Sequence, residues 1–175
     1  IVSDVQIELT TEAGLNAMNT ILQAPPDVNV VMGGSGVIGG VYAAFDSAGR
    51  GNDPNVYISS IAGGNDALDL IATGESSYKA TFGEPWSMWS YALGHYAMDW
   101  IEGKPVPRII TAPGGLVEIS TPEAALAFKA DMGDPAATWA DEEKRNTYIA
   151  MYGNISYETR DTYWRSPVTV VPSQQ

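Results

Sequence analysis

The sequence predicts an α/β protein in which a parallel β-sheet is flanked by helices in three layers. Short apolar runs of strand length alternate with segments whose apolar residues recur at helical spacing. Turns rich in glycine or proline separate these segments, and three strand–helix units follow one another directly. Consecutive units of this kind place their strands side by side in parallel and their helices over the sheet.

The first expected unit occupies the start of the chain. Residues 1–8 alternate between apolar and polar types, which predicts a strand with unequal faces. Thr10 or Thr11 can cap the helix that follows, and the proline turn at 25–27 ends it. The apolar residues of that helix recur at helical spacing: Leu15, Met18 and Leu22.

Two similar units follow. An apolar strand at 28–32 leads through glycines into a helix that Gly49 and Gly51 stop, and a strand at 56–61 leads into a short helix that ends at Gly74. The apolar faces of the two helices are Val37, Val41, Phe45 and Ala48 in the first, and Ala67, Leu68, Leu70 and Ile71 in the second.

The remainder is less regular. We expect a strand at 78–82, a strongly apolar helix at 86–102, and a strand at 106–111 that forms a hairpin with 116–119. A helix at 121–132, a polar helix at 141–152 and a terminal strand at 167–172 complete the chain. This pattern divides the chain into segments 1–83, 84–120 and 121–175.

Charge and composition exclude several classes of function. With 21 acidic and 9 basic residues the formal net charge is −12, which repels nucleic acid and anionic lipid surfaces. The chain has no cysteine and a single histidine, so disulfides and an ordinary zinc site are not expected. No apolar run approaches the roughly 20 residues that a membrane helix requires. If the protein is exported, we expect its signal peptide upstream of residue 1.

Residues 34–39 (GSGVIG) form the glycine pattern of a dinucleotide-binding turn between a strand and a helix. Such sites also need an acidic residue about 20 positions on, but Ile61 and Ala62 stand there. Close packing of the helix against the sheet is the simpler interpretation. Ser35 is not expected to be a nucleophile, because Val37 replaces the last glycine of the hydrolase elbow motif.

Other candidate groups also have simple structural interpretations. His95 lies four residues from both Tyr91 and Asp99, which favours a solvated pair on a helix surface. Acidic residues at 131–134 and 141–143 lack the spacing of a calcium loop and are expected to be solvated helix caps. The helical spacing of Trp86, Trp89 and Trp100 favours core packing, with Trp86 alone near an expected cleft. The sequence therefore predicts no catalytic residue and no metal site.

Open α/β sheets bind ligands beyond the carboxyl ends of their strands. Four turns of this chain are expected at that edge, namely 9–10, 34–36, 62–64 and 83–85.

Three groups of motifs then give the chain a resemblance to a known family. They are residues 14–18 (GLNAM) with 26–31 (PDVNVV), 56–61 (VYISSI) with Gly63 and 66–68 (DAL), and 103–107 (GKPVP). Their order and spacing over residues 1–120 resemble the ribose-type periplasmic sugar-binding proteins of ABC transporters, which share a fold with lactose-repressor-like regulators.

The resemblance implies a partial type I lobe that binds a sugar or related polar molecule without converting it, and no cofactor. It implies that an N-terminal lobe of the same receptor is missing, that an ABC permease is the membrane partner, and that the location is periplasmic or extracellular. The ligand-binding residues implied by the resemblance and the strand-end turns are Leu9, Ser35, Gly36, Ala62, Asn65, Glu84 and Trp86.

The sequence also departs from the family pattern. Glu84 replaces a usual glutamine, Leu9 a usual aromatic residue, and Ala62 a usual aspartate, so an ordinary ribose or galactose specificity is not expected. Tryptophans of helix 86–102 would favour self-association if they are exposed. The alternatives are a dinucleotide-binding domain of an oxidoreductase and the effector domain of a lactose-repressor-type regulator.

Overall fold

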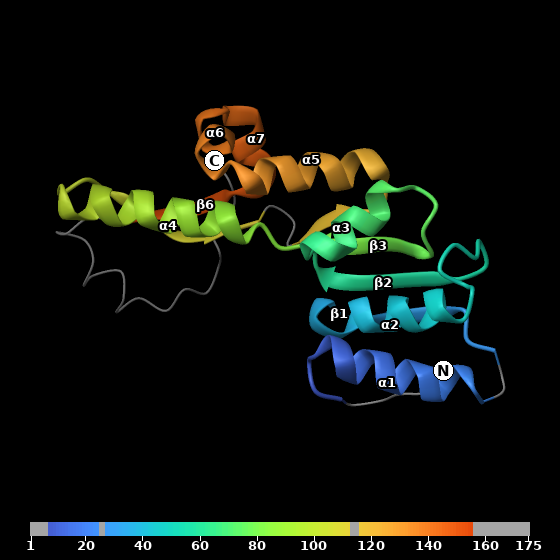
Figure 1. Cartoon of the computed structure of the whole chain (residues 1–175). Coiled ribbons are helices and arrows are strands. Elements are labelled where there is room, and N and C mark those ends of the chain that lie inside the picture. Colours follow the sequence, from blue (N-terminus) through green and yellow to red (C-terminus); the bar gives the residue numbers. More distant parts are fainter. Residues whose placement is uncertain (1–6, 25–26, 113–115, 156–175) are drawn as a thin grey trace. The chain divides into compact units, whose positions relative to one another are not determined.

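A computed structural model of the chain describes residues 7–24, 27–112 and 116–155. The chain forms two compact units, one comprising Ile1–Glu84 with Glu118–Ala130 and the other Pro85–Val117 with Asp131–Gln175. The expected fold class is confirmed, because the structure is α/β with a mostly parallel sheet flanked by helices (Figure 1). No helix in the described ranges is long and apolar enough to cross a membrane. The expected division into segments 1–83, 84–120 and 121–175 stays a prediction.

The first unit contains a four-stranded sheet in the order β1-β2-β3-β5, and β2 is parallel to both β1 and β3. Its strands are β1 (Val30–Gly34), β2 (Tyr57–Ala62), β3 (Tyr78–Gly83) and β5 (Val117–Ile119). Its helices are α1 (Thr11–Leu22), α2 (Ser35–Ser47) and α3 (Asn65–Ala72), and α5 (Pro122–Gly133) begins in it.

The second and third expected strand–helix units are therefore confirmed. Thr10 caps α1 as expected, accepting a hydrogen bond from the Ala13 N–H at 3.1 Å. The strand expected at 1–8 and the terminal strand expected at 167–172 lie outside the described residues, apart from Ile7 and Glu8, which are not in a strand.

The core of the first unit lies between the sheet and its helices. Phe45 and Ile58 are fully buried there, as are Ile38 and Tyr78. The other sheet face carries large apolar side chains that are 43–74% exposed: Val30, Met32, Tyr57, Ile61 and Phe82. Because only one face of the sheet is buried, strand residues of similar hydrophobicity differ strongly in exposure.

The second unit contains the long helix α4 (Trp86–Ile101), the short helices α6 (Pro135–Ala140) and α7 (Glu142–Tyr148), and a two-stranded antiparallel sheet. The strands of this sheet are β4 (Val106–Thr111) and β6 (Ala150–Ile155).

Two sequence-based expectations for this region are wrong. The strands at 106–111 and 116–119 do not form a hairpin, because β5 joins the sheet of the first unit and buries Ile119 against Gly83. The polar helix expected at 141–152 ends at Tyr148, since Ile149 adopts an extended conformation with φ −126° and the chain continues as β6. Ile149 is β-branched, and such residues favour an extended over a helical backbone, so the helix ends before it.

Of the three tryptophans expected to pack in a core, Trp89 and Trp100 are half-buried and Trp86 is exposed. Trp86 is 57% exposed and Leu93 is 63% exposed, whereas the fully buried residues of the helix are the smaller Met88 and Ala92. Helical spacing identified an apolar stripe correctly, but it could not show which side of the helix is covered.

Candidate ligand-binding site

The carboxyl ends of three parallel strands meet at one edge of the sheet. Gly34 at the end of β1 pairs with Ile61, and Ala62 at the end of β2 pairs with Gly83 at the end of β3. Because α2 and α3 begin within three residues of these strand ends, their N-termini lie at this edge (Figure 1). Open α/β sheets bind their ligands at such an edge.

A crevice of about 210 Å³, lined by both polar and apolar side chains, lies between α2 and α3. Ser35 and Asn65, the first residues of the two helices, line it together, and the Ser35 side chain lies beside the backbone of Gly64. The other lining residues are Thr11, Gly36, Ile38, Gly39, Gly64, Asp66, Ala67, Leu70 and Tyr78.

Two helix N-termini supply hydrogen-bond donors to this crevice. The residues that precede α2 and α3 are Gly34 and Gly64, which have no side chain that could cap the helix. The first backbone N–H groups of a helix have no partner within the helix and carry partial positive charge. Among the described lining residues, Asp66 is the only one with a formal charge.

The turn after β2 has an uncommon backbone conformation. Ala62 has φ +92°, a conformation that residues with a Cβ rarely adopt, and Gly63 follows with φ +63°. The Gly63 N–H donates a hydrogen bond of 3.2 Å to Thr81 Oγ1, which also lies 2.8 Å from Ser60 Oγ. The two buried hydroxyl groups therefore hold the turn in this conformation. Backbone strain such as that of Ala62 is common near binding sites.

Three of the seven expected ligand-binding residues, Ser35, Gly36 and Asn65, lie together in the crevice. Leu9 is 77% exposed and lines a neighbouring, mainly apolar cavity of about 440 Å³ beside β1. Ala62 and Glu84 lie at the ends of β2 and β3 but do not line the crevice.

The last expected residue, Trp86, begins α4 in the second unit.

Three polar residues of the crevice were not predicted from the sequence: Thr11, Asp66 and Tyr78. Thr11 and Asp66 lie in the first turns of α1 and α3, and an acidic residue in a first turn could have been noticed. Tyr78 begins β3 and is only 1% exposed. Burial raises the pKa of Tyr78 to about 12, and the nearby hydroxyl of Ser60 offsets this rise only in part.

The glycines of residues 34–39 and Gly40 serve close packing, as expected, but mainly between helices. A Cβ atom on Gly40 would lie 1.9 Å from the carbonyl oxygen of Thr11, and one on Gly36 would lie 3.0 Å from that of Leu9. Gly14 of α1 approaches the Val37 carbonyl in the same way. These glycines therefore allow a close approach of α1 and of Leu9 before it, and not the expected contact with the sheet.

His95 and Asp99 form the expected pair on α4, with His95 Nε2 3.6 Å from Asp99 Oδ2. The histidine side chain is 47% exposed, but its ring also lies 5.3 Å from that of Trp139. Trp139 contacts Tyr91 and Tyr96 as well, so this aromatic cluster packs α6 on α4.

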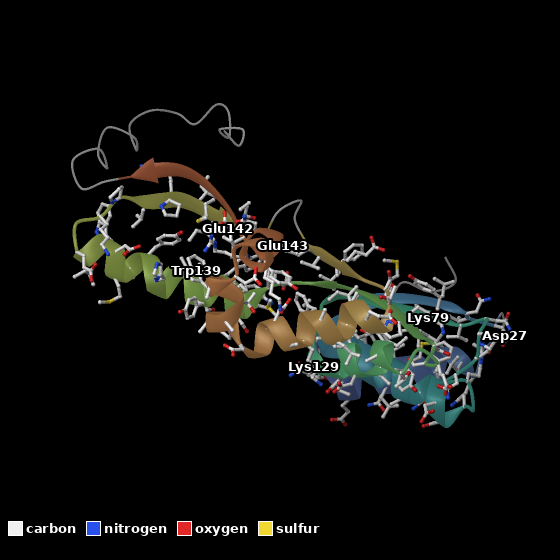
Figure 2. The ribbon with its side chains drawn as sticks, turned by 90° about the horizontal axis from the view of Figure 1, so that it is seen from above. Asp27, Lys79, Lys129, Trp139, Glu142 and Glu143 are labelled. Atoms are coloured by element: carbon white, nitrogen blue, oxygen red, sulfur yellow. The ribbon has the colours of Figure 1, made fainter. Side chains whose placement is uncertain are left out.

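Two of the acidic residues are helix caps, as expected. Asp134 accepts a hydrogen bond from Ala137 N–H at 3.0 Å, and Asp141 accepts one from Lys144 N–H at 3.1 Å. The expectation is wrong for Asp131, which is buried because its carboxylate accepts hydrogen bonds from Tyr148 Oη and Lys144 Nζ. Glu142 and Glu143 are exposed in the first turn of α7 (Figure 2). No group of metal-ligating side chains occurs among the described residues.

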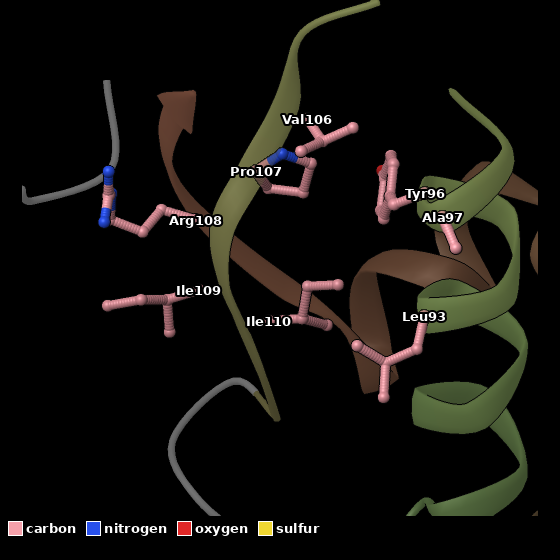
Figure 3. Close-up of a pocket in the computed structure, with 8 residues that line it drawn as sticks. All are labelled: Leu93, Tyr96, Ala97, Val106, Pro107, Arg108, Ile109 and Ile110. Atoms are coloured by element: carbon pink, nitrogen blue, oxygen red, sulfur yellow. The ribbon is translucent and has the colours of Figure 1, made fainter. Parts of the chain in front are cut away.

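The second unit has a larger but mainly apolar groove of about 570 Å³. Leu93, Tyr96 and Ala97 of α4 face Val106 and Ile110 of β4 across it, whereas Arg108 and Ile109 point to the opposite side of the strand (Figure 3). With few polar groups facing inward, the groove offers less for recognition of a polar ligand than the crevice does.

Comparison with known proteins gives structural likeness without sequence likeness. No protein-family model matches the chain, and no curated protein does. A crystal structure from Mycobacterium smegmatis in complex with β-D-fucofuranose matches with a TM-score of 0.59 and 18% identity, covering 82% of this chain and 44% of that one. A second crystal structure from the same organism matches with a TM-score of 0.50 and 19% identity over 78% and 44%. At this identity the likeness shows the fold alone, and the chain spans less than half the length of either structure.

Proposed function

We propose that this chain is part of the extracytoplasmic solute-binding component of an ABC transporter, and that it binds a sugar or a related polar small molecule without converting it. The observation that carries the proposal is the crevice at the carboxyl edge of the sheet, which Ser35 and Asn65 line together at two helix N-termini. Neutral hydroxyl groups both donate and accept hydrogen bonds, so they match a lining of N–H donors and oxygen acceptors.

The structural likeness supports the same class of ligand. One of the similar structures holds a furanose sugar, and its fold matches most of this chain. On this proposal the partners are an ABC permease and a further lobe of the same receptor, and the location is periplasmic or extracellular. The net charge of −12 argues against nucleic acid as a partner.

Calorimetric titration of the chain with D-fucose, L-arabinose, D-ribose, xylitol and NAD⁺ tests the proposal. We expect at least one sugar or polyol to bind and to be recovered unchanged after incubation. Ser35→Ala and Asn65→Ala should weaken that binding several-fold, because each removes one hydrogen-bonding group from the crevice. Exposed residues of α4 and α1 provide the matched controls Ser90→Ala and Asn19→Ala, which should bind as the wild type does.

Binding of NAD⁺ but of no sugar or polyol would contradict the proposal. That result would favour the dinucleotide-binding alternative, for which the glycine turn at 34–36 lies at the required junction of a strand and a helix. Self-association of the chain, expected from exposed tryptophans, is also a prediction, and sedimentation equilibrium tests it.

A further inference from the structure

The helix α4 is apolar on the side that the second unit buries and also on the opposite side. Met88 and Ala92 are fully buried, whereas Trp86 is 57% and Ile101 is 75% exposed. Asp99 is the only acidic residue in the sequence of α4, which has no lysine or arginine. A helix at a protein surface normally carries charged residues on its outer side, and one that is apolar all round is normally covered on both sides. The outer side of α4 therefore has the composition of an interface.

The exposed residues of this outer side form a continuous stripe, which we call the α4 stripe. At 3.6 residues per turn they fall within about a third of the helix circumference, opposite Met88 and Ala92. The members of the stripe are Trp86, Ser90, Leu93, Gly94, Ala97 and Ile101. Leu93 and Ala97 also line the groove beside β4, so the stripe and the groove form one apolar surface (Figure 3).

The order of residues in the α4 stripe is symmetric about its centre. Successive members are 4, 3, 1, 3 and 4 residues apart, a spacing that is the same in both chain directions. Antiparallel packing of two copies therefore brings Trp86 of one copy to the level of Ile101 of the other. At the centre it brings Leu93 to the level of Gly94, and the positive end of each helix lies beside the negative end of the other. Only a second copy of the same helix makes use of this symmetry.

The area of the α4 stripe fits a reversible dimer. Leu93 is 63% and Met98, at the edge of the stripe, is 56% exposed. Together with Trp86 and Ile101 they present roughly 500 Å² of apolar surface, if each side chain has about 200 Å² in all. Standard interfaces bury about 800 Å² on each partner, and weak or transient ones bury less than about 600 Å². The stripe and the adjoining groove therefore predict a dimer that dissociates at micromolar concentration.

We propose that the α4 stripe is an interface between two copies of this chain, which pack their α4 helices antiparallel about a two-fold axis at Leu93 and Gly94. A two-fold interface uses the same surface on both copies, and dimers of this symmetry are the commonest assemblies of identical chains. The crevice of the first unit contributes no residue to the stripe, so the proposal does not depend on the proposed function.

Sedimentation equilibrium tests the proposal. The wild type should show a monomer–dimer equilibrium between roughly 1 µM and 1 mM chain. Added salt should strengthen the dimer, because it screens the repulsion between two copies that each carry a net charge of −12.

Two variants place like charges at the axis. Leu93→Glu brings two carboxylates together and Gly94→Lys brings two ammonium groups together, so each variant alone should dimerise at least about ten-fold more weakly. The fold should tolerate both, since Leu93 is exposed and a Cβ atom at Gly94 meets nothing within 4 Å. Unfolding midpoints measured below the dissociation constant, where the wild type is also monomeric, check this.

An equimolar mixture of the two variants tests the antiparallel arrangement. In the mixed pair the new carboxylate of one copy lies level with the new ammonium group of the other, so opposite charges replace like charges. The mixture should therefore dimerise more tightly than either variant alone.

Matched controls lie on α5. Leu126 is 58% exposed, and a Cβ atom at Gly133 meets nothing within 4 Å, so Leu126→Glu and Gly133→Lys should dimerise as the wild type does. A wild type that stays monomeric at every concentration would overturn the proposal and leave the stripe to another partner, such as a further lobe of the receptor. Equal weakening by the control variants, or a mixture that dimerises no better than its components, would overturn it as well.

Discussion

The closest approach between α1 and α2 depends on a single hydrogen atom at Gly40. A methyl group there would lie 1.9 Å from the Thr11 carbonyl oxygen and 2.6 Å from the Leu15 nitrogen, and both of these atoms belong to the backbone. Backbone atoms cannot rotate away as a side chain can, so α1 would have to move. The glycines of α2 thus determine how closely α1 can pack.

Gly40→Ala should therefore lower the free energy of unfolding by about 1–3 kcal/mol, the usual cost of overpacking. Gly94→Ala is the control, since an added Cβ there meets nothing within 4 Å and alanine favours the helix, so stability should rise by up to about 1 kcal/mol. Urea-induced unfolding measures both. Equal stability of the two variants would show that α1 does not depend on Gly40.

Ala62 stores strain at the edge where the ligand is proposed to bind. Its φ of +92° is unfavourable for alanine and allowed for glycine. Ala62→Gly should raise the free energy of unfolding by about 0.5–1 kcal/mol, since relief of strain exceeds the added flexibility of the unfolded chain. Ala97→Gly, at an exposed position inside α4, should instead lower it by about 1 kcal/mol. A destabilised Ala62→Gly variant would show that the turn is not strained.

At the scale of elements, a buried carboxylate joins α5 to α7. Asp131 is 7% exposed, and it accepts hydrogen bonds from Tyr148 Oη at 2.7 Å and from Lys144 Nζ. Thr138 Oγ1 of α6 donates to the Asp131 carbonyl at 2.9 Å. These polar contacts connect three helices and help to fix their arrangement.

Tyr148→Phe removes one donor from this buried carboxylate and should lower the free energy of unfolding by about 1.5–3 kcal/mol, the range for a hydrogen bond to a charged group. Tyr91→Phe, at a half-exposed position on α4, provides the control and should change stability little. Chemical denaturation followed by tryptophan fluorescence measures both. An unchanged midpoint in Tyr148→Phe would mean that water replaces the lost donor at no cost.

At the scale of the whole molecule, buried tyrosines make the free energy of unfolding depend on pH in the alkaline range. Burial raises the pKa of Tyr78 from 10.0 to about 12, and burial together with Asp131 raises the pKa of Tyr148 as well. In the unfolded chain these phenols ionise near pH 10, whereas in the folded chain they stay neutral. The contribution of the buried tyrosines to the free energy of unfolding is therefore fully present below pH 10, and it is lost as the pH rises from 10 toward 12.

The free energy of unfolding should fall by about 1.4 kcal/mol per pH unit for each buried tyrosine over that interval. Urea-induced unfolding at pH 9, 10 and 11 measures the slope, and Tyr78→Phe should show a shallower slope than the wild type. Stability that is independent of pH up to 11, or an identical slope in the variant, would contradict the burial of the Tyr78 phenol.

Local chemistry determined much of this fold and part of its site. Helical and strand periodicity, the Thr10 cap and the glycine turns sufficed to predict α1 to α3 and β1 to β3, because each of these signals acts within a few residues. The parallel arrangement that the sequence predicts already places Ser35 and Asn65 at one edge of the sheet. The position of Asp131 in a buried network could not be predicted in the same way.

Contacts between distant segments decided the rest. The choice of β6 over β5 as the partner of β4, the exposure of Trp86 and the burial of Tyr78 all depend on which surfaces meet in the folded chain. Periodicity shows that a face is apolar, but only tertiary packing decides whether another element covers it. The sequence pattern shows Tyr78 only as a strand residue, and the packing around β3 decides that its side chain is buried.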